Sequence, residues 1–118
     1  KLESIEKGFL METLVLHELR SYIAIKCCGG ALSYWRTPSE SEIYIIYSRG
    51  KKNIGIEIKY GENWRKEYSR TLNDLYNEKY LSNCFGVYNG NHALKDGHVN
   101  IYPLKLFMQK LNAGEIIP

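Results

Sequence analysis

Residues 42–60 read EIYIIYSRGKKNIGIEIKY and decide the fold, because they predict two β-strands joined by a turn. Both halves are rich in Ile and Tyr, and the second half alternates apolar and polar residues, which is typical of strands. Between the halves, the charged segment SRGKK at residues 48–52 contains Gly50, a residue type that tight hairpin turns favour. The stretch therefore predicts an antiparallel hairpin.

The second strand of this hairpin has two unlike faces. Glu57 and Lys59 share one face, about 7 Å apart, because side chains alternate along a strand. The opposite face is apolar and consists of Ile54, Ile56 and Ile58. Tyr44 of the first strand faces the two charged residues. Since ionised side chains are seldom buried unless they are paired or bind a metal, this charged face is a candidate site.

Hydrophobic periodicity and turn residues extend the prediction outward from the hairpin. In chain order, the expected elements are a helix at about 2–26, strands at 31–35, 42–47 and 53–60, a helix at 64–80, strands at 83–88 and 98–102, and a helix at 103–113 with Gly114 just past its end. Glycines are expected to end the first helix, and the long second helix lets the following strand run parallel to the preceding one. The predicted fold class is α/β, with a central mixed sheet of about five strands and helices packed on it.

Length and composition indicate one globular domain spanning residues 1–118. The net charge of +3 permits a phosphate-bearing partner without demanding one. The three cysteines have no zinc-site spacing and are expected to be reduced thiols. With neither a signal peptide nor an apolar run of membrane length, we expect a cytoplasmic protein with no membrane partner. The chain starts at Lys1, so we interpret it as part of a longer protein.

Glu12 is the third candidate site residue. On a helical wheel it falls in the middle of an apolar stripe made by Ile5, Phe9, Leu16, Leu19 and Ile23. If the first helix packs on the charged face of the hairpin, Glu12 meets Glu57 and Lys59. Two readings then remain open. One is a buried Glu–Lys ion pair that joins helix to sheet. The other is a nuclease-type site, in which carboxylates hold Mg²⁺ and the lysine steadies the attacking water.

The residues also resemble a known family. The segments GFLMETLVLHEL, YWRTPSESEIYII, IGIEIKYG, GVYNG and VNIYPLKLFMQKL, spread from Gly8 to about Leu111, are similar to the C-terminal domain of a prokaryotic ATPase family, a domain of unknown function numbered 4143. In that family the domain follows an AAA-type ATP-binding module. The domain is itself similar to the PD-(D/E)XK nuclease superfamily, which includes Holliday-junction resolvases and restriction enzymes. The resemblance implies a restriction-endonuclease-like core.

Carried onto this sequence, the resemblance assigns Glu12 as the helix carboxylate, and Glu57 with Lys59 as the E-x-K pair. The family pattern on the middle strand is an acidic residue, an aliphatic residue and Asp, and here Glu42 begins that pattern while Tyr44 takes the Asp position. A phenol ionises near pH 10 and is a poor ligand for Mg²⁺, so the resemblance implies a degenerate site with no metal expected. If the site is active, Glu57 and Glu12 hold Mg²⁺, and Glu42 could reach toward the ion.

Basic residues offer a further candidate surface. Nucleic-acid contacts are conceivable for Arg36, Arg49, Lys51 and Lys52, although solvated turn and strand ends explain the same residues. The histidines at 17, 92 and 98 share no metal spacing and are expected at the surface.

The predicted function is a degenerate nuclease-like domain that acts as a binding or scaffolding module. Its expected partners are the upstream ATPase module of the same chain and, conceivably, DNA, and ATP is used only in that upstream module. Two alternatives remain: a Mg²⁺-dependent endonuclease using Glu12, Glu42, Glu57 and Lys59, and a domain for self-association or protein contact. The oligomeric state stays open.

Overall fold

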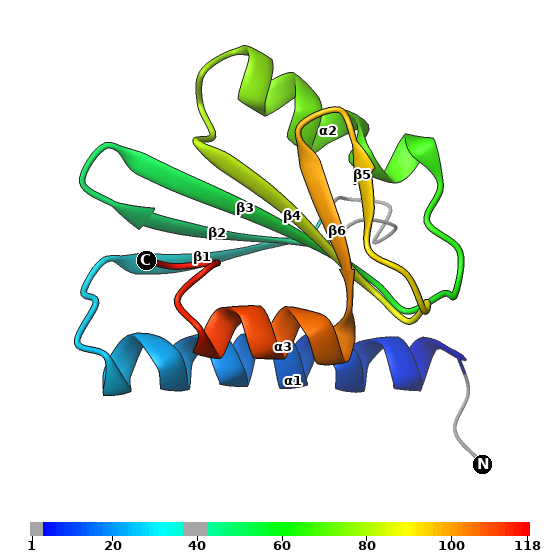
Figure 1. Cartoon of the computed structure of the whole chain (residues 1–118), viewed down its shortest axis with the longest axis horizontal. Coiled ribbons are helices and arrows are strands. Elements are labelled where there is room, and N and C mark those ends of the chain that lie inside the picture. The colour runs from blue at the N-terminus through cyan, green and yellow to red at the C-terminus, as the bar shows by residue number, and fades with distance from the viewer. Residues whose placement is uncertain (1–3, 37–42) are drawn as a thin grey trace.

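The computed structural model describes residues 4–36 and 43–118 of the chain (Figure 1). In chain order the elements are α1 (Ser4–Ile25), β1 (Ala31–Arg36), β2 (Ile43–Arg49), β3 (Lys52–Lys59), α2 (Lys66–Asn77), β4 (Asn83–Tyr88), β5 (Leu94–Asp96), β6 (Val99–Pro103) and α3 (Leu104–Asn112). The predicted α/β class is confirmed.

The described strands form one six-stranded mixed sheet in the order β1-β2-β3-β4-β6-β5. Strands β1, β2 and β3 are antiparallel neighbours, and Gly50 has φ of 62° in the predicted hairpin turn. Strand β4 runs parallel to β3 after the α2 crossover, as expected, and β6 runs parallel to β4. The sheet has one strand more than the predicted five. The extra strand, β5, lies between the strands predicted at 83–88 and 98–102, where no element was predicted. Its three residues carry no strand pattern of their own and are held by pairing with β6.

The sheet is covered on both faces, with α2 on one face and α1 and α3 on the other (Figure 1). The core beneath α1 and α3 takes the isoleucine face of β3. Its buried residues are Met11, Val15, Leu19, Tyr22, Ile45, Tyr47, Ile54, Ile56, Ile58, Phe85, Val87, Phe107, Leu111, Ile116 and Ile117. The core beneath α2 is smaller and takes the other face. Its buried residues are Tyr44, Ile46, Leu72, Leu81, Cys84, Tyr88, Val99 and Ile101.

Helix α1 has the predicted length, but it buries a different stripe from the one predicted. Its buried residues are Met11, Val15, Leu19 and Tyr22. By contrast, Phe9 is 60% exposed, and Leu16 and Ile23 only border the core. Apolar residues occur on more than one side of this helix, so the wheel alone selected the wrong side. Glu12 therefore lies at the flank of the packed stripe and not in its middle.

The end of α1 also differs from the prediction. Cys27 adopts a left-handed φ of 52°, and the Cys28 N–H donates to the Ile23 carbonyl at 3.0 Å. These contacts form a Schellman cap, in which the left-handed position is taken by Cys27 and not by the glycines that follow. At the other end of the chain, Gly114 ends α3 with φ of 77°, as its position predicted.

Candidate functional site

Glu57 and Lys59 lie on the face of β3 that α2 covers. The Glu57 side chain is fully buried, and its Oε2 lies 3.5 Å from Lys59 Nζ. Lys59 Nζ also lies 4.6 Å from the ring centroid of Tyr68 on α2, which places the charged pair on the α2 side of the sheet. The positive charge of Lys59 thus compensates a carboxylate that has been removed from water.

Tyr44 stands next to this pair, as the sequence predicted. It is the register partner of Glu57 across β2 and β3, and it is 8% exposed. Directly opposite residues on neighbouring strands point to the same side with β-carbons about 5 Å apart. The phenol therefore occupies the position beside Glu57 from which a second carboxylate could share a metal ion.

Aromatic side chains cover the site from the α2 side. Gly86 is the register partner of Glu57 on β4, and a β-carbon at Gly86 would lie 2.6 Å from Cη2 of Trp64. The Trp64 indole N–H donates to Ser69 Oγ at 2.7 Å, and its ring meets Tyr68 edge-on. The absent side chain at 86 is what lets the indole approach the sheet this closely. Sequence reasoning missed this contact between Trp64 and Gly86.

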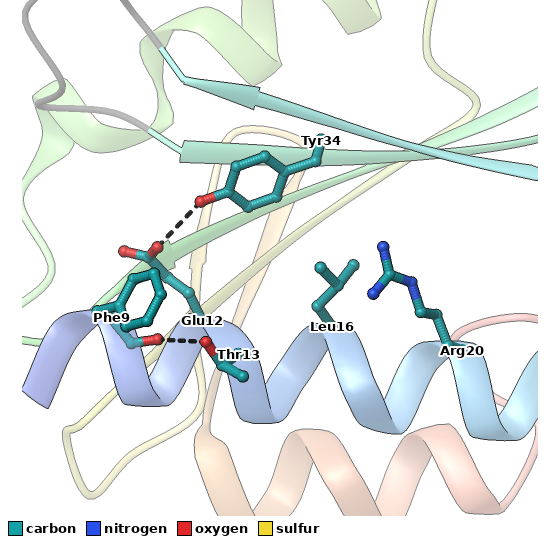
Figure 2. A pocket seen from close by; sticks show the side chains of 6 residues that line it. All are labelled: Phe9, Glu12, Thr13, Leu16, Arg20 and Tyr34. Carbon is teal, nitrogen blue, oxygen red and sulfur yellow. Dashed lines mark hydrogen bonds between the residues drawn. The ribbon is translucent and has the colours of Figure 1, made fainter.

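Glu12 does not join Glu57 and Lys59, so the predicted convergence is wrong. The Glu12 carboxylate accepts hydrogen bonds from the Tyr34 hydroxyl at 3.1 Å and from Arg36 Nη2 at 3.2 Å (Figure 2). Helix α1 packs on the isoleucine face of β3, and the charged pair lies on the opposite face. The sheet therefore separates Glu12 from the E-x-K pair. This happens because the apolar stripe of α1 packs on the apolar face of β3, which is the isoleucine face and not the charged one.

Glu12, Tyr34 and Arg36 form a separate polar triad between α1 and β1. Arg36 Nη2 also donates to the Tyr34 hydroxyl at 2.8 Å, and the Glu12 and Arg36 side chains are 12% and 31% exposed. Partial burial raises the pKa of Tyr34 above its usual 10.0, and the neighbouring Glu12 carboxylate raises it further, whereas Arg36 acts in the opposite direction. Sequence reasoning missed this role of Tyr34. The available signal was its spacing of two from Arg36, which places both on one face of a strand.

The predicted nucleic-acid residues do not form one patch. Arg36 pairs with Ile43 at one end of β2, and Arg49 lies at the other end, next to the turn that holds Lys51 and Lys52. The two arginines lie six residue steps apart along the sheet, which is about 20 Å. Arg36 is engaged by Glu12, and Arg49 donates to the carbonyls of Cys28 and Pro118 at 3.4 and 3.0 Å.

The remaining predictions concern metal ligands and the membrane. Glu42 falls outside the described residues. Within residues 4–36 and 43–118, no three His, Cys, Asp or Glu side chains are grouped so that they could hold a metal ion. The histidines at 17, 92 and 98 are exposed, as expected. In the same part of the chain, none of the helices combines the length and the apolar character that a membrane span requires.

Comparison with known proteins gives one result. No curated protein and no solved structure matches the chain significantly. One sequence family does match, over residues 7–107, which covers α1 through the first part of α3. The chain therefore belongs to the family described as Domain of unknown function (DUF4143).

Proposed function

We propose that this chain is a catalytically inactive, nuclease-like domain that serves as a binding or scaffolding module. In this proposal it lies on the C-terminal side of an AAA-type ATP-binding module, and ATP is used in that module alone. The carrying observation is the setting of Glu57. This carboxylate is fully buried, is neutralised by Lys59, and stands opposite a phenol where a metal site would need a second carboxylate.

Access argues against hydrolysis at this position. A metal-dependent nuclease must bring a divalent ion and a phosphodiester to its carboxylates. Here Glu57 has no exposed surface and the Lys59 side chain is 14% exposed, while Trp64 and Tyr68 lie over the same face. Glu12 is separated from Glu57 by the sheet and is held by Arg36. The described carboxylates therefore do not provide a joint metal site.

The topology supports a nuclease-like ancestry. A helix, three antiparallel strands, a crossover helix and a parallel strand follow one another from α1 to β4, which is compatible with the restriction-endonuclease-like core that the resemblance implies. The E-x-K residues occupy β3, as they would in such a core. The proposed position beside an ATP-binding module comes from the resemblance to the ATPase family, in which the C-terminal domain is the domain that this chain matches.

The proposal is tested by calorimetric titration of the chain with Mn²⁺ and Mg²⁺. We expect no binding by the unmodified chain and a gain of Mn²⁺ affinity in Tyr44→Asp, because an aspartate there stands beside Glu57 on the same face. Tyr44→Phe is the matched control, since it removes the hydroxyl without adding a ligand. Micromolar metal binding by the unmodified chain that disappears in Glu57→Ala, together with cleavage of plasmid DNA, would overturn the proposal.

A further inference from the structure

The two edges of the sheet are built very differently. At one edge, β5 has three residues and includes Lys95 and Asp96. At the other edge, β1 has six residues in unbroken register with β2, and among the described residues β2 is its only strand partner. Tyr34 and Trp35 on β1 are 42% and 60% exposed.

Natural sheets usually protect an edge by keeping it short, charging it or bending it with a bulge, because unpaired N–H and C=O groups recruit another strand. Strand β5 carries the first two protections. Strand β1 is longer and has no bulge, its one charged residue, Arg36, stands at its end and is bound by Glu12, and its exposed side chains Tyr34 and Trp35 are aromatic. An edge of this kind is an association surface.

We infer that β1 pairs with the β1 of a second copy of this chain, antiparallel, across a two-fold axis at Ser33. The result is a closed dimer with one continuous sheet. This inference deepens the proposed binding role, since it names a surface and a partner for it. Because the far edge at β5 is short and charged, the pairing ends at two copies.

The geometry of strands selects the register. When two copies pair across a two-fold axis, the same face of each sheet lies on the same side of the joint sheet. Side chains alternate along a strand, so opposite residues point to the same face only if their numbers differ by an even number. The axis therefore passes between the two copies of one and the same residue. An axis at Ser33 sets Leu32 against the partner's Tyr34 and Ala31 against the partner's Trp35. These pairs cover part of the exposed Tyr34 and Trp35 rings with apolar side chains. An axis at Tyr34 would instead set Arg36 against the partner's Leu32.

Side chains of α1 are arranged symmetrically about the same axis. A groove of about 330 Å³ runs beneath β1, with Glu12 toward one end, Leu16 in the middle and Arg20 toward the other (Figure 2). Glu12 bonds Tyr34 and Arg36, and β1 runs back along α1 (Figure 1). Leu16 lies about 6 Å further along the helix, which corresponds to about two strand residues and brings it level with Ser33.

A two-fold axis at Ser33 therefore brings the Glu12 end of one groove toward the Arg20 end of the other. Within the described residues, Arg20 has no acidic group within ion-pair distance. Glu12 is already paired with Arg36 of its own chain, so this approach offers Arg20 a carboxylate that two arginines share, and the choice of arrangement rests on the strand pairs.

Disulfide trapping tests the register. In a Cys27→Ser, Cys28→Ser background, Ser33→Cys places two thiols directly opposite one another, with Cα atoms about 5 Å apart and within disulfide range. The matched control is Trp35→Cys, whose two copies lie about 13 Å apart along the strands and cannot be bridged. We expect mild oxidation to trap a covalent dimer with Ser33→Cys and not with Trp35→Cys. Equal trapping of both variants, or trapping of neither, would overturn the register.

Sedimentation velocity over a concentration series tests the dimer itself. The unmodified chain is expected to sediment as a dimer at high concentration, and Ser33→Glu to shift toward the monomer, because it sets two carboxylates against each other at the axis. Lys95→Glu makes a comparable change at the β5 edge and should leave the dimer intact. A monomer at every concentration refutes the inference, as does equal weakening by both substitutions. Neither result depends on metal, so a failure here is distinguishable from a failure of the inactive-nuclease proposal.

Discussion

Gly86→Ala is the most direct test of how the E-x-K face is closed. The added methyl would lie 2.6, 2.9 and 3.0 Å from three carbons of the Trp64 ring. The indole cannot simply withdraw, because it bonds Ser69 and its ring meets Tyr68 and Tyr88 edge-on at 5.5 and 6.2 Å. Overpacking of this kind typically costs about 1–3 kcal/mol of unfolding free energy.

At about 4 °C per kcal/mol for a domain of this size, Gly86→Ala should lower Tm by roughly 4–12 °C. Thermal unfolding followed by far-ultraviolet circular dichroism measures this shift. Gly61→Ala is the matched control, because the nearest atom to its added methyl is the Asn63 carbonyl oxygen at 4.0 Å. A Tm for Gly86→Ala equal to that of Gly61→Ala would refute the close seating of Trp64 on the sheet.

Two further predictions follow from the raised pKa values. Since the folded-state pKa of Tyr34 lies above its ordinary 10.0, its contribution to stability is present below pH 10 and is lost as pH rises through the folded pKa. Urea unfolding between about pH 9 and pH 11 should therefore show a shallower loss of stability in Tyr34→Phe, and the same pH dependence in both proteins would contradict the raised pKa of Tyr34. Burial raises the pKa of Cys84 to about 11, so in native protein at pH 8 a thiol-specific reagent should modify Cys27 and Cys28 quickly and Cys84 only on unfolding, and fast labelling of all three would contradict its buried position.

Much of the fold was predictable because local patterns and tertiary packing agree. The hairpin around Gly50 and the parallel return of β4 follow from turn chemistry and from the length of α2. Strand β5 was not predictable in the same way. Its three residues are held by pairing with β6 and not by any propensity of their own.

In the candidate site too, the local features were predictable and the tertiary placement was not. The alternation of β3 correctly placed Glu57 and Lys59 together, with Tyr44 opposite, because strand periodicity is a local property. The position of Glu12 depended on which face of the sheet α1 covers, which is a tertiary choice. The three isoleucines of β3 carried the relevant signal, since the apolar stripe of a helix packs on the apolar face of a strand.

The residues that follow the family match are part of the folded core. The family match ends at residue 107, yet Ile116 and Ile117 are 2% and 0% exposed, and Tyr22 on α1 donates to the Ile117 carbonyl at 2.8 Å. Truncating one buried isoleucine to alanine typically costs about 2–5 kcal/mol, and a whole domain is stable by only about 5–15 kcal/mol. A fragment that ends where the family match ends, at residue 107, would therefore lose two buried isoleucines and the hydrogen bond that ties this end of the chain to α1.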